Sequence, residues 1–167
     1  MKEPTRILIV EDNAEDADLA KHTLGRLLKE CEFRVVKTSS DFLDQLESFQ
    51  PDVILSDYSL PQFDGMNALK LTLKHAPLTP LIIWTGSISE DMAVACMKAG
   101  ANNYILKENL KRLGPAVVRA LEERDVMLAH KQAEDALQNS EKRFRALIKN
   151  DIIRLGPAVE GRRGKVR

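Results

Sequence analysis

The sequence has few cysteines and few aromatic residues, and it contains no long apolar run. Its two cysteines, Cys31 and Cys96, do not form a C-x-x-C pair, and the N-terminal residues lack the layout of a signal peptide. No apolar run approaches the roughly 20 residues that a membrane helix needs. These absences argue against a disulfide-rich secreted protein and against a membrane protein. They favour a cytoplasmic location with both thiols reduced.

An excess of charge of one sign is also missing. Lys and Arg together number 25, and so do Asp and Glu, so no global field favours nucleic acid or a membrane surface. The sequence has no glycine-rich nucleotide-binding motif, no helix-turn-helix pattern with a basic recognition helix, and no histidine in a kinase-like context. We therefore expect no direct DNA binding and no kinase activity from this stretch. Hydrophobic residues make up 44%, which is enough to form a core.

Short apolar runs alternate with helical patterns along the first 120 residues or so. The predicted strands lie at 6–10, 33–37, 52–57, 81–85 and 103–106. The predicted helices lie at 14–30, 40–49, 65–76 and 90–101, and a long one follows from about residue 110. The strands are continuous apolar runs, which is typical of a parallel sheet covered on both faces. The pattern predicts an α/β fold: a flavodoxin-like, doubly wound five-stranded parallel sheet of order 2-1-3-4-5, with a long C-terminal helical extension.

Polar side chains follow four of the predicted strands. Glu11 and Asp12 follow the first strand, Asp57 ends the third, Thr85 the fourth and Lys107 the fifth. Each of them alone could be structural, as a helix cap, a strand residue or a surface lysine. In a doubly wound sheet, however, the carboxyl ends of the strands share one edge, and sites lie there at the switch in strand order. We therefore expect these five side chains to converge.

Three carboxylates at one edge repel one another unless a cation compensates them. Only hard oxygen ligands are on offer, with no His or Cys at the cluster, which favours Mg²⁺, Mn²⁺ or Ca²⁺ over zinc. Lys107 supplies a positive charge suited to a phosphoryl oxygen, and Thr85 supplies a hydroxyl. A carboxylate such as Asp57, held between a metal and a lysine, is a plausible nucleophile toward a phosphoryl group.

Four motifs carry a resemblance to a known family. They are "ILIVEDN", "DVILSDYSLPQFDGM", "LIIWTGS" and "AGANNYILK", and they occur in order, at suitable spacing, between residue 5 and about residue 122. In these motifs the chain resembles the receiver domain of two-component response regulators, and the resemblance covers the whole predicted sheet.

The resemblance implies that Asp57 is the phosphoacceptor of a phosphorelay, supplied by a sensor histidine kinase or a phosphotransfer protein. It implies that Mg²⁺ is held by Glu11, Asp12, Asp57 and the backbone carbonyl of Ser59. Phosphatases of the aspartyl-phosphate type need a second acid two residues after the nucleophile, and this position is Ser59 here. We therefore expect no enzymatic activity beyond phosphorylation of Asp57 itself.

The resemblance also assigns roles at the fourth and fifth strands. Lys107 would pair with the acyl phosphate, Thr85 would swing to bond it, and Tyr104 would rotate inward as a switch. The family usually has proline directly after the lysine, often with a cis bond, whereas Glu108 follows here. Because a cis bond without proline costs about 3–4 kcal/mol, we predict a trans Lys107–Glu108 bond.

The remainder of the chain predicts a helical stem. We assign 1–122 to the receiver domain, 123–150 to a signalling helix, and 151–167 to a short basic tail expected to be disordered. The helix shows spacings of 4 and 3 typical of a coiled coil, which favours a parallel homodimer. The positions concerned are Val126, His130, Ala133, Leu137, Ser140, Phe144 and Leu147. His130 and Ser140 are polar, so a solvated helix is the alternative.

The segments 106–124 and 130–150 resemble receivers and linker helices that precede PAS domains and sensor kinase modules. Two alternatives to a simple phosphoacceptor module remain open. The chain could be the front fragment of a hybrid sensor histidine kinase. It could also be a constitutive scaffold or dimerisation module that is never phosphorylated, although such a module would be expected to lack a site residue, and none is missing.

Overall fold

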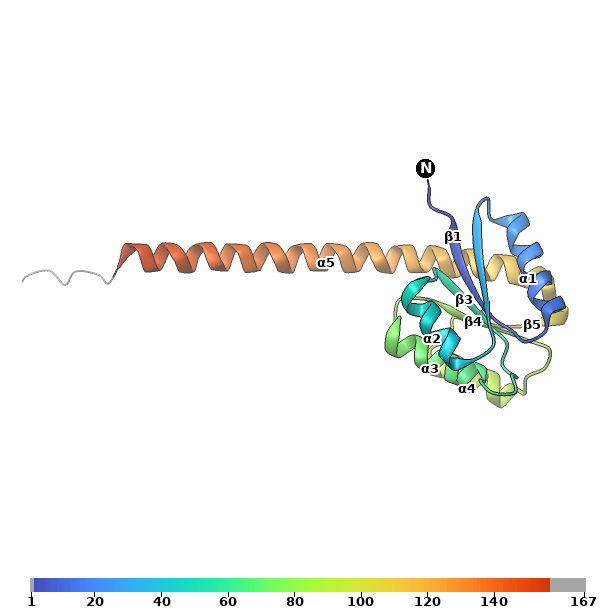
Figure 1. Ribbon diagram of the computed structural model, residues 1–167. Helices are drawn as coiled ribbons and strands as arrows, with labels where there is room; N and C mark the ends of the chain where they lie inside the picture. Colours follow the sequence, from blue (N-terminus) through green and yellow to red (C-terminus); the bar gives the residue numbers. More distant parts are fainter. Residues whose placement is uncertain (1, 157–167) are drawn as a thin grey trace, which may run out of the picture. The chain divides into compact units, whose positions relative to one another are not determined.

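The computed structural model describes residues 2–156 and consists of five strands, each followed by a helical segment (Figure 1). The strands are β1 (Thr5–Val10), β2 (Cys31–Val36), β3 (Val53–Ser56), β4 (Leu81–Thr85) and β5 (Asn103–Leu106). The helices are α1 (Ala14–Leu27), α2 (Ser39–Ser48), α3 (Gly65–His75), α4 (Glu90–Ala99), the 3₁₀ helix η1 (Lys107–Arg112) and α5 (Leu113–Leu155).

The strands form one parallel sheet of order β2-β1-β3-β4-β5, which confirms the predicted topology. Every residue of β3 and β4 is buried, as are the last four residues of β1, whereas the edge strands β2 and β5 are only partly buried. The inner strands are continuous apolar runs because helices cover both faces of the sheet, as the sequence predicted.

Two hydrophobic clusters hold the layers together, one on each face of the sheet. On one face, Leu8 and Ile54 pack with residues of α2, α3 and α4, including Phe42 and Leu69. On the other face, alternate strand residues pack with α1 and with the first turns of α5. Figure 1 shows α2, α3 and α4 together on one side of the sheet and α1 on the other. The core thus fixes the strands, and with them the edge where the strands end.

Several element ends differ from the predicted boundaries, most of them by one or two residues, and the differences around α1 and before α5 are the most informative. Helix α1 ends at Leu27 rather than at residue 30, because Leu28 is already extended. Strand β2 begins at Cys31, two residues earlier than predicted. The long helix does not start near residue 110: η1 comes first, and α5 begins only at Leu113.

The chain divides into two compact units at Met127–Leu128, and α5 contributes residues to both. Helix α5 continues to Leu155, beyond the predicted end at residue 150. The remainder of the predicted basic tail, residues 157–167, lies outside the described residues. In the part of the chain that the structure describes, no helix has both the length and the apolar character that crossing a membrane requires.

Candidate functional site

Two backbone hydrogen bonds place the acidic residues at the carboxyl edge of the sheet. The Asp57 amide donates to the carbonyl of Val10, the last residue of β1, at 2.9 Å. The Glu11 amide donates to the carbonyl of Val36, the last residue of β2, at 3.1 Å. Both carboxylates therefore sit directly beyond neighbouring strands, as the order of the sheet predicted.

The loop after Asp57 is held close to the start of α3. The Gly65 amide donates to the Tyr58 carbonyl at 2.9 Å. A Cβ atom on Gly65 would lie 3.0 Å from Tyr58 Cα and 3.1 Å from the Asp57 carbonyl oxygen, tighter than most Cβ contacts. A glycine is therefore required by the close approach of two backbone segments. The effect is to keep the loop carrying Asp57 against the sheet.

Lys107 lies at the centre of the site and donates to three carboxylates. Its Nζ is 2.7 Å from Glu11 Oε2, 2.8 Å from Asp57 Oδ2 and 2.8 Å from Asp16 Oδ2. An ammonium group has three protons, so these three bonds use its full donor capacity. The same Nζ also lies 5.2 Å from the centre of the Trp84 ring, within the range of a cation–π contact.

The carboxylates expected to hold a metal do lie together. One oxygen each from Glu11, Asp12 and Asp57 can be chosen so that all three lie within 4.8 Å of one another. Glu11 and Asp57 are buried and Asp12 is exposed, which leaves the cluster open to solvent on one side. Mg²⁺ binds carboxylate oxygens and keeps several of its waters. Three carboxylate oxygens with one side open to solvent therefore suit this ion. The residues present therefore fit the expected cation.

Burial and charge shift two pKa values at the site in ways that follow from the geometry. Burial raises the pKa of the Glu11 carboxyl above its ordinary value, although hydrogen bonds from Lys107 and the Asn13 amide oppose the effect. Burial alone would lower the pKa of the Lys107 ammonium, but its hydrogen bonds to Asp16, Asp57 and Glu11 outweigh it and raise the pKa. Lys107 is thus a permanent cation in the physiological range.

Of the remaining predicted residues, Ser59 lies two positions after Asp57, Thr85 is the last residue of β4, and Tyr104 lies within β5. The Ser59 amide donates to Asp57 Oδ1 at 3.2 Å. The Thr85 hydroxyl is buried and donates to the Ser87 carbonyl at 3.3 Å. Tyr104, on β5, is 38% exposed. The predicted movements of Thr85 and Tyr104 stay predictions.

The peptide bond that follows Lys107 has the predicted geometry. None of the peptide bonds within residues 2–156 is cis, so the Lys107–Glu108 bond is trans, as predicted. The chain continues directly into η1, which the sequence analysis did not separate from α5.

Asp16 is the site residue that the sequence analysis missed. It lies in the first turn of α1, four residues after Asp12, and its carboxylate reaches Lys107. A signal was present, because the first turn of a helix that follows a strand lies beside that strand's carboxyl end. Acidic residues in the first turn also stabilise a helix through its dipole, so Asp16 by itself did not indicate a site.

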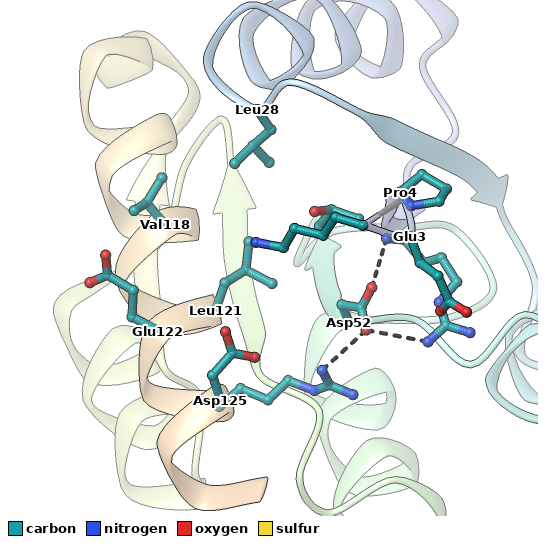
Figure 2. Close-up of a pocket in the computed structure, with 12 residues that line it drawn as sticks. Glu3, Pro4, Leu28, Asp52, Val118, Leu121, Glu122 and Asp125 are labelled. Carbon is teal, nitrogen blue, oxygen red and sulfur yellow. Dashed lines mark hydrogen bonds and ion pairs between the residues drawn. The ribbon is translucent and has the colours of Figure 1, made fainter. Parts of the chain in front are cut away.

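A pocket lies at the opposite, amino-terminal end of the strands (Figure 2). It has a volume of about 480 Å³ and is lined by Asp52, the residues before β1, and one face of α5 that includes Val118, Leu121 and Asp125. The lining mixes acidic, basic and apolar side chains. None of the predicted site residues lines it, so this pocket is separate from the candidate site at the carboxyl edge.

Comparisons with known proteins agree with this geometry. The chain is 31% identical over 136 residues to the Regulatory protein AtoC of Escherichia coli K12, covering 81% of this chain and 29% of that protein. It is 33% identical over 101 residues to the DNA-binding transcriptional regulator NtrC of Proteus hauseri, covering 60% of this chain and 21% of that protein. The chain thus spans less than a third of the length of these relatives, and the DNA binding named for the second is a property of that longer protein.

A solved structure gives the same fold. The crystal structure of a CheY-like response regulator receiver domain protein from Methanospirillum hungatei JF-1 has a TM-score of 0.67 and 28% identity, covering 75% of this chain and 99% of that one. The family model described as the response regulator receiver domain matches residues 7–119, which include most of β1, all of β2 to β5, helices α1 to α4 and the first turns of α5. With the acidic cluster, the lysine and the sheet order in place, the chain belongs to the response regulator receiver domain family.

Proposed function

We propose that this chain is the phosphoacceptor module of a two-component phosphorelay, with Asp57 as the residue that accepts the phosphoryl group. The observation that carries the proposal is the hydrogen bond of 2.8 Å from Lys107 Nζ to Asp57 Oδ2, at an edge that Glu11 and Asp12 share. A single lysine placed against a buried carboxylate can neutralise the charge that a phosphoryl group brings.

The proposed reaction transfers a phosphoryl group from a phosphohistidine of a sensor kinase or phosphotransfer protein. An oxygen of Asp57 attacks the phosphorus, an O–P bond forms, and the P–N bond breaks with its electron pair passing to the imidazole nitrogen. Asp57 is oriented for this attack, because Lys107 holds one of its oxygens and the Ser59 amide holds the other. The protein supplies positioning and charge, which is most of what this transfer requires.

Glu11, Asp12 and Asp57 would hold the divalent cation, with the backbone carbonyl of Ser59 as a further ligand. When bound, Mg²⁺ supplies charge neutralisation for phosphoryl oxygens. Within the chain itself, Glu11 is held in place by the Asn13 amide and by Lys107. We propose no further enzymatic activity for the chain.

The test is the intact mass of the protein after incubation with acetyl phosphate and Mg²⁺. We expect wild type to gain one phosphoryl unit and Asp57→Asn to gain none, because the amide nitrogen and oxygen of Asn are far weaker nucleophiles than a carboxylate. A sample of wild type with the metal removed by a chelator is expected to react at least tenfold more slowly. Equal phosphorylation of the wild type and Asp57→Asn would mean that another residue is the acceptor.

The output of the module is the second part of the proposal. Phosphorylation would bias a two-state equilibrium that involves Thr85 and Tyr104, and α5 would carry the change onward to a homodimer formed through its later turns. What supports a role for α5 is its length, together with the exposure of Leu137, Phe144 and Leu147. The alternative is a hybrid sensor histidine kinase, in which this stretch would be the front fragment and a PAS domain and a kinase module would follow the linker helix. A constitutive scaffold is disfavoured by the complete set of site residues.

A further inference from the structure

Lys107 is shared among three carboxylates that differ in how deeply they are buried. The side chain of Glu11 is 1% exposed and that of Asp57 is 10% exposed, whereas that of Asp16 is 32% exposed. A buried carboxylate that loses its cation is left without compensation, which is strongly unfavourable. A partly exposed one can be solvated by water instead. Asp16 is therefore the partner that Lys107 can release most easily.

Phosphorylation of Asp57 would add a further hydrogen-bond acceptor for Lys107. Each of its three protons is already engaged by a carboxylate oxygen. A new bond from Nζ to a phosphoryl oxygen therefore requires that one of the three existing bonds be given up. Asp16 also carries a negative charge close to the place where the phosphoryl charge develops, so it opposes the reaction electrostatically as well.

We propose that Asp16 is a positioning residue that holds Lys107 toward α1 in the unphosphorylated protein and competes with the phosphoryl group for it. The proposal rests on the proposed function of Asp57 and adds a specific restraint to it. Asp16 touches no reacting atom and acts only through Lys107. Its removal should release Lys107 for the phosphoryl group and raise the rate at which Asp57 is phosphorylated.

The matched pair for the test is Asp16→Asn and Glu15→Gln. Both variants remove one negative charge from the first turn of α1. Among the described residues, however, the ion pairs of Lys107 involve Glu11, Asp16 and Asp57 and not Glu15. A general change in the field at the site would therefore affect both variants alike, whereas loss of the Lys107 contact affects Asp16→Asn alone.

The first readout is the phosphorylation rate with saturating Mg²⁺ over a range of acetyl phosphate concentrations. We expect Asp16→Asn to raise the maximal rate roughly fivefold, the effect expected from losing one partly exposed charged hydrogen bond. Glu15→Gln should stay within about twofold of wild type. Equal rates for the two variants, or a slower Asp16→Asn protein, would overturn the proposal. If wild type is not phosphorylated at all, the proposed function of Asp57 fails instead.

The second readout needs neither metal nor phosphodonor. Trp84 is the single tryptophan of the chain, and Lys107 Nζ lies 5.2 Å from the centre of its ring. When Asp16 no longer draws Nζ toward α1, the cation shifts relative to the ring, and the emission of Trp84 should change. We expect that change for Asp16→Asn and not for Glu15→Gln, with unchanged far-UV circular dichroism for both. Emission identical to wild type in Asp16→Asn would show that Asp16 does not position Lys107.

Discussion

At the scale of single residues, Cys96 illustrates how burial governs chemistry away from the site. Its side chain is fully buried, where it packs with residues of the sheet and of α3. Burial raises the pKa of the Cys96 thiol above its ordinary value, and the charge of Asp64 adds to the effect. The protein interior thus keeps this thiol protonated and unreactive, which agrees with its interpretation from the sequence as part of the core.

The raised pKa of Cys96 predicts a pH dependence of stability. As the pH rises above about 9, the unfolded chain ionises this thiol before the folded protein does, so the free energy of unfolding falls. The loss attributable to Cys96 should reach at most about 1.4 kcal/mol at about pH 10. Cys96→Ala should be about 1 kcal/mol less stable at pH 7 because of lost packing, yet should lose less stability between pH 8 and 10.

Urea unfolding of both proteins under reducing conditions measures this difference. If the two proteins lose the same free energy of unfolding between pH 8 and pH 10, the alkaline decline belongs to other groups and the prediction is wrong.

At the scale of the elements, Asp52 joins three of them at the amino-terminal end of the sheet (Figure 2). Asp52 Oδ2 accepts from the Arg6 amide at 2.8 Å. Its Oδ1 pairs with the guanidinium of Arg6 at 3.4 Å and with that of Arg124 on α5 at 3.1 Å. The residue thereby connects β1, the start of β3 and α5, at the end of the sheet opposite Asp57.

We predict that Asp52→Ala lowers the free energy of unfolding by about 2–3 kcal/mol, because it leaves the largely buried Arg124 without a carboxylate and removes the acceptor of the Arg6 amide. The control is Glu32→Ala, which removes the exposed ion pair of Glu32 with Arg34 at 3.1 Å. That change should cost less than about 1 kcal/mol. Urea unfolding of both variants would reveal the difference, and equal losses would argue against the connecting role of Asp52.

At the scale of the whole molecule, the later turns of α5 stand out by their exposed apolar side chains. Within residues 128–155, α5 carries large apolar side chains that are more than 40% exposed, namely Leu137, Phe144, Leu147, Ile148, Ile152 and Ile153. Of the six predicted heptad positions in this range, Leu137, Phe144 and Leu147 are among them. The other three are the polar residues His130 and Ser140 and the small residue Ala133. Burying such side chains against a second helix is the usual source of coiled-coil stability.

We predict that the protein forms a homodimer through these turns and that Leu137→Asp combined with Phe144→Asp converts it to a monomer. The matched control is Gln138→Asp, which adds a charge one residue away from the heptad positions and should leave the dimer intact. Equilibrium sedimentation at high protein concentration gives the mass directly. A monomeric wild type would rule out the coiled coil and leave α5 as a solvated helix.

The pattern of apolar runs and helical periods was enough to predict the sheet and the residues that gather at its carboxyl edge. Continuous apolar runs predicted the strands, since only a doubly covered sheet buries them. The side chains after those strands gave Glu11, Asp12, Asp57, Thr85 and Lys107 as candidate site residues. The family resemblance then assigned their expected roles. The exact ends of α1 and the short helix η1 did not follow from the pattern, because a helix end depends on the backbone conformation of a single residue such as Leu28.

Which charges meet could not be predicted without the folded structure. Asp16 and Lys107 are 91 positions apart in the sequence, and their contact depends on the fold bringing the first turn of α1 and the start of η1 to the same edge of the sheet. Likewise, the contact of Asp52 with Arg124 depends on where α5 crosses the sheet. Local patterns record which side chains favour a helix or a strand. They do not record which of many similar surface charges will be brought within hydrogen-bond distance, because that depends on the packing of the whole fold.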